Sequence, residues 1–290
     1  MYKRQPLTLE YVTEVLMREN AHGILLQFGG QTAINLALPL EARLPVLNMD
    51  LEILGTSCDA IDEASDRERF EAFAERIGLQ MPRGATGTSA DDVRSAVEKI
   101  GYPVLIRPSY VLGGRGMEIL ANEKQLEAYL AEAYLAPDKP LLVDEYLGHA
   151  IELDVDAASD GKEVLIGAVM EHLEEAGIHS GDSTCFIPTQ NISDEMLERV
   201  REQTKKIGIG LKIHGCFNIQ FAIQGDNLYC LEVNPRSSRT VPFVAKATGV
   251  PMARIAARVT LGIELSEQDI PEATSGHVAV KAPVFPFIKL

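Results

Sequence analysis

A predicted β-hairpin in the last quarter of the chain constrains the fold more than any other segment. Two stretches that alternate between apolar and polar residues, 217–224 and 228–234, flank the turn sequence Gly225-Asp226-Asn227. Alternation with a period of two is typical of a strand with one buried face, and a short glycine-containing link between two such strands is typical of a hairpin. On a three-residue turn, the apolar face consists of Ile219, Phe221, Leu231 and Val233.

The other face of this hairpin carries oxygen-bearing side chains. The same turn places Gln220 opposite Glu232 and Asn218 opposite Asn234, and Arg236 follows just past the strand end. Directly opposed side chains lie about 5 Å apart at Cβ, close enough for two oxygens to share one hard cation. This alternation alone does not indicate a function, because any half-exposed hairpin shows it. A polar face without Lys, Thr or Ser, ending in Asn-Pro-Arg, favours a site for a magnesium-bound polyphosphate.

Composition and charge argue against several classes of function. The chain has 290 residues, enough for two lobes, and 46% hydrophobic and 24% charged residues are ordinary for a globular protein. The net charge of −15 argues against nucleic-acid binding. No apolar run approaches the roughly 20 residues of a membrane span and no secretory segment begins the chain, so we expect a cytoplasmic protein with no membrane partner. Four cysteines without CxxC spacing indicate reduced, buried thiols.

The pattern of elements divides the chain into an α/β segment and a larger mixed segment. The first segment has a helix over 8–20, a strand over 24–28, a helix over 29–43 and a strand around Val46. It lacks a first strand, so we expect the chain to begin inside a domain. Strands and helices then segregate, which predicts α+β rather than a doubly wound sheet. The strands expected there are 104–107, 117–120, 141–147, 151–157, 163–172 and the hairpin, and the helices are 66–77, 90–100, 123–135, 193–209, 244–248 and 252–261.

A glycine-containing loop from Arg107 to Gly116 joins two of these strands. It is neither a Walker A loop, which needs Gly-Lys-Ser/Thr before a helix, nor a dinucleotide fingerprint. Its glycines would let backbone N–H groups approach a phosphate, with Arg107 and Arg115 adding positive charge. A plain hairpin loop explains the sequence equally well.

Two more polar stretches allow both a functional and a structural interpretation. Glu152 shares a strand face with Asp154 and Asp156. An acidic strand face is usually solvated, whereas a functional Glu152 would accept hydrogen bonds from ribose hydroxyls. Residues 177–183 are polar and glycine-rich, as in a mobile binding loop or a surface connection. His179 within them decides nothing, because a lone histidine is more often structural.

Taken together, these motifs resemble the large subunit of carbamoyl phosphate synthetase, an ATP-grasp enzyme. The matching stretches are Gly29-Gly-Gln-Thr, Arg107-Pro-Ser-Tyr-Val-Leu-Gly-Gly, Glu171-His172 through residues 177–183, Glu232-Val-Asn-Pro-Arg and Lys246-Ala-Thr-Gly-Val-Pro. The likeness runs from about Pro6 over almost the whole chain. It implies part of an α/β pre-ATP-grasp domain over 1–56, an ATP-grasp domain over 57–265 and a trailing segment over 266–290, with both ends looking truncated.

The resemblance also implies a reaction. Such large subunits contain two similar ATP-grasp halves, one phosphorylating bicarbonate and the other carbamate. Residues 113–117 (Gly-Gly-Arg-Gly-Met) and 239–243 (Arg-Thr-Val-Pro-Phe) resemble the carbamate half. The implied activity is a ligase step, ATP-dependent phosphorylation of carbamate to carbamoyl phosphate, within glutamine-dependent synthesis for arginine and pyrimidine biosynthesis. The implied partners are the remainder of the large subunit and the glutamine-hydrolysing small subunit. The alternatives are the bicarbonate-phosphorylating half and a nucleotide-binding scaffold without turnover.

Finally, the resemblance assigns roles to individual residues around ATP and Mg²⁺ or Mn²⁺. Arg67 and Arg107 would contact nucleotide phosphates, Glu145 and Leu147 would border the adenine, and Glu152 would hold the ribose. The nucleotide pocket would also be lined by Gly177, Ile178, His179 and Ser180.

The metal would be ligated by three residues of the hairpin, Gln220, Glu232 and Asn234, of which Gln220 and Glu232 would also contact the nucleotide. Arg236 would face the transferred phosphoryl group, and Asn234 would act beside it.

Overall fold

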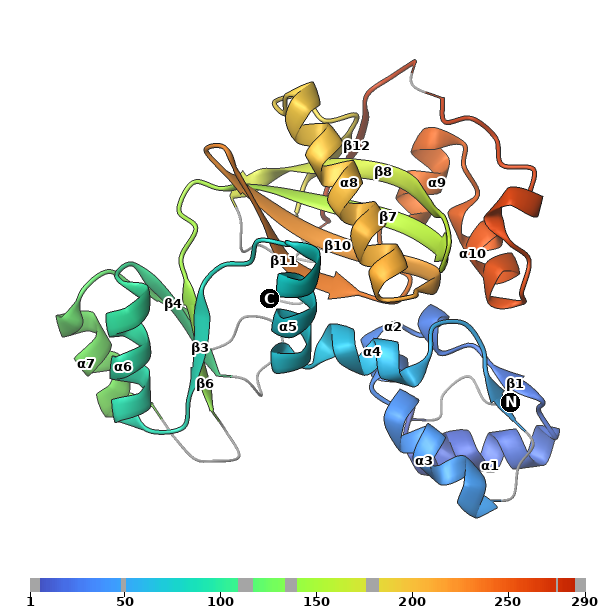
Figure 1. The fold of residues 1–290 in the computed structure, drawn as a ribbon, viewed down its shortest axis with the longest axis horizontal. Helices are drawn as coiled ribbons and strands as arrows, with labels where there is room; N and C mark the ends of the chain where they lie inside the picture. Colours follow the sequence, from blue (N-terminus) through green and yellow to red (C-terminus); the bar gives the residue numbers. More distant parts are fainter. Residues whose placement is uncertain are drawn as a thin grey trace.

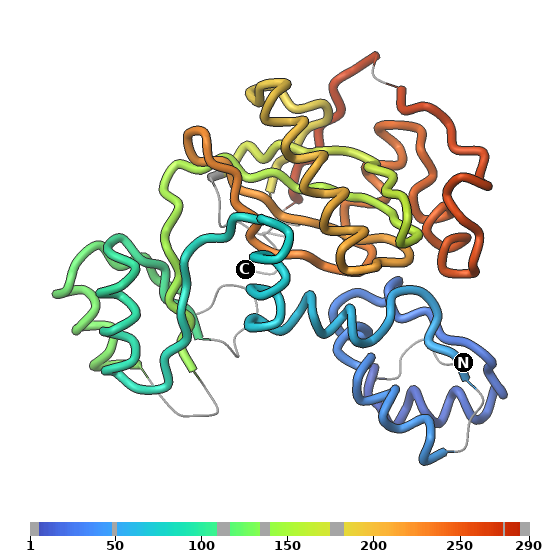
Figure 2. The backbone as a smooth tube through the Cα atoms, viewed as in Figure 1, coloured from blue at the N-terminus to red at the C-terminus, as the bar shows by residue number. Residues whose placement is uncertain are grey.

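The chain folds into a small N-terminal lobe and two lobes that each contain a larger sheet (Figure 1). The computed structural model describes residues 6–47, 51–108, 117–133, 140–175, 183–274 and 276–284. The N-terminal lobe joins the rest through one pair of helices (Figure 2). This arrangement confirms the predicted fold, a mixed α+β domain preceded by an α/β segment.

The N-terminal lobe packs helices around one short pair of parallel strands. Its elements are α1 (Leu9–Glu19), β1 (Gly23–Ile24), the 3-10 turn η1 (Leu26–Phe28), α2 (Gly30–Ile34), α3 (Ala37–Leu47) and β2 (Glu52–Ile53). Thr8 accepts a hydrogen bond from Tyr11 N and so caps α1, as predicted. The lobe's core is formed by Leu16, Leu26, Ile34, Leu40 and Leu44.

Both strand predictions in this lobe need correction. Only Ile24 of the predicted strand 24–28 lies in a strand, and residues 26–28 form η1. The cause is tertiary, because the buried side chain of Gln27 bonds to groups outside the strand pair. Val46 lies in α3 with 75% of its surface exposed, so this apolar residue does not mark a core strand. The predicted helix 29–43 is divided into α2 and α3.

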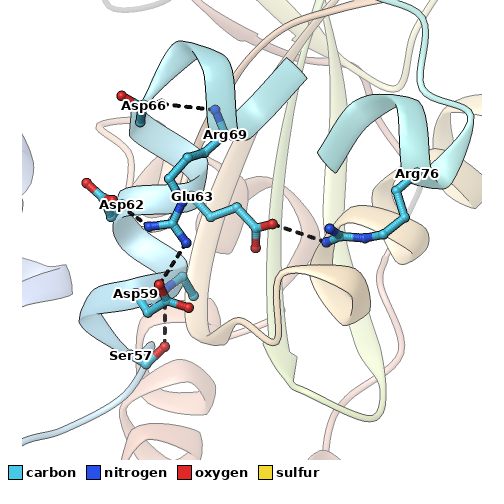
Figure 3. Close-up of polar contacts among 8 residues, drawn as sticks. Ser57, Asp59, Asp62, Glu63, Asp66, Arg69 and Arg76 are labelled. Atoms are coloured by element: carbon cyan, nitrogen blue, oxygen red, sulfur yellow. Dashed lines mark hydrogen bonds and ion pairs between the residues drawn. The ribbon is translucent and has the colours of Figure 1, made fainter. Parts of the chain in front are cut away.

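Helices α4 (Cys58–Ser65) and α5 (Arg67–Ile77) form the connection to the other lobes, and the sequence patterns did not predict α4. Asp66 lies at the corner between them and accepts a hydrogen bond from Arg69 N (Figure 3). Figure 3 also shows the ion pairs that join the helices, Arg69 with Asp59 at 2.7 Å and Arg76 with Glu63 at 3.1 Å. These contacts fix the direction in which α5 leaves the corner, and therefore the position of Arg67 at its start.

The small-sheet lobe has four antiparallel strands in the order β3-β6-β4-β5. Helices α6 (Ala90–Ile100) and α7 (Glu123–Glu132) cover one face of this sheet (Figure 1). The strands are β3 (Gly84–Gly87), β4 (Val104–Pro108), β5 (Glu118–Leu120) and β6 (Leu141–Glu145). The strands predicted at 104–107, 117–120 and 141–147 and the helix predicted at 90–100 are all present.

The large-sheet lobe has six strands in the order β11-β10-β7-β8-β9-β12. They are β7 (Ile151–Asp160), β8 (Val164–Glu175), β9 (Cys185–Ile187), β10 (His214–Gln224), β11 (Asn227–Asn234) and β12 (Ala279–Lys281). Helix α8 (Asp194–Gly210) packs on one face with Val155 and Ile219. Helices α9 (Val241–Thr248) and α10 (Met252–Thr260) pack on the other face with Ala158 and Cys216. By alternation, Asp154, Asp156 and Gln220 share this second face.

The register of the hairpin confirms both predicted opposed pairs but not the predicted turn. Asn218 pairs with Asn234 and Gln220 pairs with Glu232. The turn itself has two residues, since Gln224 pairs with Asn227, and a β-bulge restores the register between Gln220 and Phe221. Leu231 is the extra residue of the bulge, and it packs with Leu147, Ala150, Ala222 and Tyr229 instead of joining the predicted apolar face.

Burial of the cysteines agrees with the expectation from their spacing. All four are free thiols in the interior. Burial raises the pKa of Cys58 and Cys216 to about 12 and that of Cys185 to about 11. Among the described residues, no helix is long and apolar enough to cross a membrane.

Candidate functional site

A cavity of about 700 Å³ opens where the α4–α5 corner, the small sheet and the hairpin meet. Its volume falls within the range of small-molecule sites. It brings together six of the residues singled out from the sequence, which are Arg67, Arg107, Glu145, Leu147, Gln220 and Glu232. Apolar side chains complete the wall, among them Phe70, Met81, Ile119, Leu142 and Leu231. The cavity therefore offers a flat ligand an apolar slot with charged groups at its edge.

The hairpin supplies a set of oxygen donors at this edge. Gln220 and Glu232 are direct cross-strand partners, and Asn234 Nδ2 donates to Glu232 Oε1 at 2.7 Å. Carboxylate and amide oxygens are suitable ligands for Mg²⁺, so these three residues fit a hard cation. A cation held by all three would replace the bond between Asn234 and Glu232. In the described part of the chain, no three acidic, histidine or cysteine side chains form another metal site.

Arg236 lies directly beside these oxygen donors. Its Nη2 donates to Asn234 Oδ1 at 2.9 Å, and its Nε donates to Gln31 Oε1, also at 2.9 Å. Partial burial lowers the pKa of Arg236, and the charge of Glu232 opposes that shift. The guanidinium nevertheless keeps its positive charge at neutral pH, because an arginine in a protein is not deprotonated there.

Two arginines at the opposite wall are bridged by one carboxylate. Asp144 Oδ1 accepts from Arg67 Nη2 at 3.1 Å, and Asp144 Oδ2 lies 3.5 Å from Arg107 Nε. Glu71 Oε1 also accepts from Arg67 Nε at 2.9 Å. Gly84, opposite Asp144 in the sheet, leaves the space for this bridge, because a Cβ there would lie 1.9 Å from Arg67 Nη2.

Glu145 is held by a second arginine contact. Arg83 donates to the Glu145 carboxylate from Nε and from Nη2, each at 3.1 Å, and from its backbone N at 3.2 Å. These bonds from the Arg83 side chain are the main cause that lowers the pKa of Glu145. The Glu145 carboxylate is thus engaged by Arg83 at the point where Glu145 lines the cavity.

The acidic face of β7 is buried, which excludes the solvated face that the sequence left as one alternative. Glu152 is 2% exposed, and Asp154 and Asp156 are fully buried. Asn218 Nδ2 donates to the carboxylates of both aspartates, and Thr240 Oγ1 donates to Asp156 Oδ2 at 2.6 Å. Buried acids of this kind need such donors, because an isolated charge in the interior is costly.

Glu152 does not line the cavity in the described structure. Its Oε1 lies 3.6 Å from His172 Nδ1, and both side chains are buried. The proposed contact with ribose stays a prediction. Gly177, Ile178, His179 and Ser180 lie outside the described residues, and so do Arg115 and the glycines of its loop.

The buried carboxyl group of Asp156 predicts how the stability of the fold depends on pH, which can be measured without an activity assay. Burial raises the pKa of Asp156 and outweighs the hydrogen bonds from Ser238, Thr240 and Asn218. A carboxyl group with a raised folded-state pKa binds more protons in the folded than in the unfolded state. It therefore lowers the free energy of unfolding as the pH rises from its unfolded pKa, about 3.9, toward its folded pKa.

We expect Asp156→Asn, measured without divalent metal, to melt at a higher temperature than wild type at pH 8, with the difference narrowing toward pH 5. Thermal denaturation across this range measures it. Asp226→Asn, the same change at the exposed hairpin turn, is the control and should give no such trend. A melting-temperature difference between Asp156→Asn and wild type that widens as the pH falls would contradict a raised pKa for Asp156.

The structure also identifies site residues that the sequence argument missed. Asp144 and Arg83 belong to none of the sequence motifs, although Asp144 directly precedes Glu145. Gln31 lies within the Gly29-Gly-Gln-Thr stretch, which contributed to the family resemblance but suggested no role for Gln31. Only their contacts with Arg67, Glu145 and Arg236 reveal them.

Comparison with known protein families finds two matches that together cover most of the chain. Residues 66–268 match "Carbamoyl-phosphate synthase L chain, ATP binding domain", and residues 1–63 match "Carbamoyl phosphate synthase preATP-grasp domain". The carbamoyl phosphate synthase large chain of Methanoregula boonei is 53% identical over 99% of this chain, and that of Methanospirillum hungatei is 50% identical over 99%. The chain spans 27% of the length of each of these relatives.

Solved structures with the same fold include distant carboxylases. A biotin carboxylase from Campylobacter jejuni, in its beta-gamma-ATP complex, superposes with a TM-score of 0.74 at 19% identity, covering 92% of this chain and 60% of that one. The biotin carboxylase domain of a Hydrogenobacter thermophilus 2-oxoglutarate carboxylase, with MgADP and bicarbonate, gives 0.73 at 20% identity, covering 91% and 60%. At these identities the likeness concerns the fold alone.

Proposed function

Because this chain belongs to the carbamoyl phosphate synthase large-chain family, as one of its ATP-grasp halves, we propose that it binds MgATP in the 700 Å³ cavity and transfers the terminal phosphoryl group to carbamate. The products would be carbamoyl phosphate and ADP. The observation that carries the proposal is the opposition of Gln220 and Glu232, with Asn234 and Arg236 beside them, at the edge of that cavity.

The choice of carbamate rather than bicarbonate rests on sequence. Residues 239–243 follow the Asn-Pro-Arg stretch in the manner of the carbamate half, and residues 113–117 support the same choice. The bicarbonate half and a scaffold without turnover are the competing proposals. We also propose the division of the chain at 56/57 and 265/266, with the remainder of the large chain and a glutamine-hydrolysing small subunit as partners in the cytoplasm.

In the proposed mechanism the protein positions charge around the phosphates. Bound Mg²⁺, or Mn²⁺, would supply positive charge that neutralises the charge developing on the transferred group. Gln220, Glu232 and Asn234 would hold that ion. Arg67 and Arg107 would exchange part of their contact with Asp144 for phosphate oxygens, and the apolar slot bordered by Leu147 would take the adenine.

Arg236 would contribute the remaining positive charge near the acceptor. Phosphoryl transfer asks little covalent chemistry of the protein, so positioning and electrostatic stabilisation supply most of the rate. Arg236 touches the metal-ligand set through Asn234, which aligns the charge of the guanidinium with the site of the cation. Glu152 would hold the ribose, together with residues 177–180.

The decisive experiment is formation of ATP from carbamoyl phosphate and MgADP by the purified chain. The carbamate proposal expects ATP to form in a reaction that requires the divalent metal. Bicarbonate-dependent ATP hydrolysis without this reverse reaction would favour the bicarbonate half. Binding of MgATP with neither activity would favour the scaffold. We expect negligible synthesis from glutamine and bicarbonate by this chain alone, because no residue here is proposed to supply ammonia.

Gly84→Ala tests the arginine bridge. The added Cβ would displace the Arg67 guanidinium from its position in the cavity wall, so we expect ATP to bind about tenfold more weakly, the value of one charge-assisted hydrogen bond. Adenosine, which lacks phosphates, should bind as it does to wild type. Calorimetric titration of both ligands measures the difference.

The matched test is the same substitution in an Arg67→Ala background. There the new methyl group meets no guanidinium and only its contact with Asp144 Oδ1, at 2.4 Å, remains, so Gly84→Ala should weaken ATP binding less than it does in wild type. An equal loss of affinity in both backgrounds, or an equal loss for adenosine, would show that Gly84 acts through the sheet and not through Arg67.

A further inference from the structure

Two glutamines of the N-terminal lobe reach the segment that carries Arg236. Gln31 Oε1 accepts the hydrogen bond from Arg236 Nε at 2.9 Å, across 205 positions of sequence. Gln27 Nε2 donates to Pro235 O at 3.1 Å, and Ser237 N donates to Gln27 O at 2.9 Å. The residues on both sides of Arg236, as well as its guanidinium, are therefore bonded to one short stretch of the other lobe.

The Gln27 contact is part of a buried junction between the lobes. Gln27 is 2% exposed, and its Nε2 also donates to Thr56 Oγ1 at 2.7 Å. Two glycines with positive φ, Gly55 and Gly215, pack against the Gln27 amide. A Cβ would lie 2.3 Å from Gln27 Oε1 at Gly55 and 2.8 Å from it at Gly215. Thr56 Oγ1 in turn accepts from His214 N at the start of β10, at 2.9 Å. The Arg236 segment is thus fixed to the N-terminal lobe by a packed and hydrogen-bonded contact.

The Gln31 amide is oriented by a second bond. Its Nε2 donates to Asn35 Oδ1 at 2.9 Å, one helical turn further along, so its Oε1 points to Arg236. Arg236 donates to two side-chain oxygens, Gln31 Oε1 and Asn234 Oδ1. Both are neutral amide oxygens. Arg67 and Arg83, by contrast, donate to carboxylates. A neutral acceptor orients a guanidinium without cancelling its charge, which leaves that charge for an anionic ligand.

We propose that Gln31 is a positioning residue for Arg236, and that the N-terminal lobe completes the phosphoryl-transfer site through Gln31 and Gln27. This inference rests on the proposed role of Arg236 at the transferred phosphoryl group. The N-terminal lobe then does more than support the fold, because the direction of the Arg236 charge depends on how the lobe is docked.

The test compares Gln31→Ala, Gln31→Glu and Arg236→Ala in ATP formation from carbamoyl phosphate and MgADP. Gln31→Ala leaves Arg236 free to turn, so kcat should fall roughly tenfold while the KM for MgADP stays unchanged. Gln31→Glu places a carboxylate against Arg236, so kcat should fall further. Gln125→Glu, the same charge change on an exposed glutamine of α7, is the control and should behave as wild type.

A double variant separates positioning from a structural effect. In the Arg236→Ala background, Gln31→Ala should cause no further loss of kcat, because the group that it positions is gone. Equal losses in both backgrounds, or full activity of Gln31→Ala beside an impaired Arg236→Ala, would overturn the inference and leave the proposed function standing.

A readout without turnover keeps the two proposals distinguishable. The Nε–H resonance of Arg236, identified by its loss in Arg236→Ala, should exchange with water at least several-fold faster in Gln31→Ala than in wild type. If this occurs while wild type forms no ATP, the positioning contact is supported and the proposed function fails. Unchanged exchange in Gln31→Ala would overturn the positioning contact whatever the activity.

Discussion

Glu232→Gln is expected to lower kcat for phosphoryl transfer by about 100- to 1000-fold, which corresponds to about 3 to 4 kcal/mol of transition-state stabilisation that a well-held metal supplies. The substitution keeps the shape of the side chain and removes one negative charge from the proposed metal-ligand set. Glu232 is exposed on the hairpin, so the fold should be unaffected. The loss should be measured as the rate of ATP formation from carbamoyl phosphate and MgADP over a range of magnesium concentrations.

The control for this prediction lies on the same hairpin. Asp226→Asn removes the same charge at the exposed turn, away from the Gln220–Glu232 pair, and should retain wild-type activity. Wild-type turnover of Glu232→Gln at ordinary magnesium would refute the metal assignment. A melting temperature that drops together with activity would point to misfolding instead.

Asn218→Ala is expected to destabilise the fold by about 3 kcal/mol, because it removes charge-assisted hydrogen bonds from two buried carboxylates. Asn218 Nδ2 donates to both Asp154 and Asp156, so its loss leaves two buried carboxyl groups with fewer hydrogen-bond donors. For a chain of this size, the melting temperature should fall by about 6 to 12 °C at neutral pH. Protonation relieves the buried charge, so the loss should be smaller at pH 5.

Asn227→Ala offers the matched control for Asn218. This asparagine is exposed at the hairpin turn and should change the melting temperature little. In an Asp156→Asn background, Asn218→Ala should lower the free energy of unfolding by less than in wild type, since one of the two carboxylates is absent. Equal costs in the two backgrounds would mean that the Asn218 effect is loss of packing and not of charge compensation.

Much of the fold and part of the site could be predicted because local patterns report local structure. The pairs Gln220–Glu232 and Asn218–Asn234 were predicted from about twenty consecutive residues, and they hold because the bulge offsets the shorter turn. Capping residues likewise marked the start of α1 at Thr8. Three of the four strands in the small sheet followed from the same kind of pattern, whereas β3 was not predicted.

The same local patterns gave wrong answers where a distant contact decides the structure. The bulge that turns Leu231 toward Leu147 leaves no mark in the alternation. The burial of Gln27 bends residues 26–28 out of a strand, although the sequence there is apolar. The sequence also left open whether the acids of β7 are solvated or buried, because their burial depends on Asn218 and on Thr240, which lie far along the chain.

The sequence by itself therefore determined most strands of the two larger sheets and the oxygen-bearing side chains of the hairpin, since each depends on neighbours within one strand or hairpin. Tertiary structure alone decided that Arg67 and Arg107 meet across Asp144, that Arg83 holds Glu145, and that Gln31 reaches Arg236. These contacts join segments that lie 37 to 205 positions apart in the sequence, and the Gln31 contact also joins separate lobes. A periodic pattern carries no information about which surfaces pack together. Burial then sets their electrostatics, because the same carboxylate or guanidinium has a different pKa and a different free energy once water is removed.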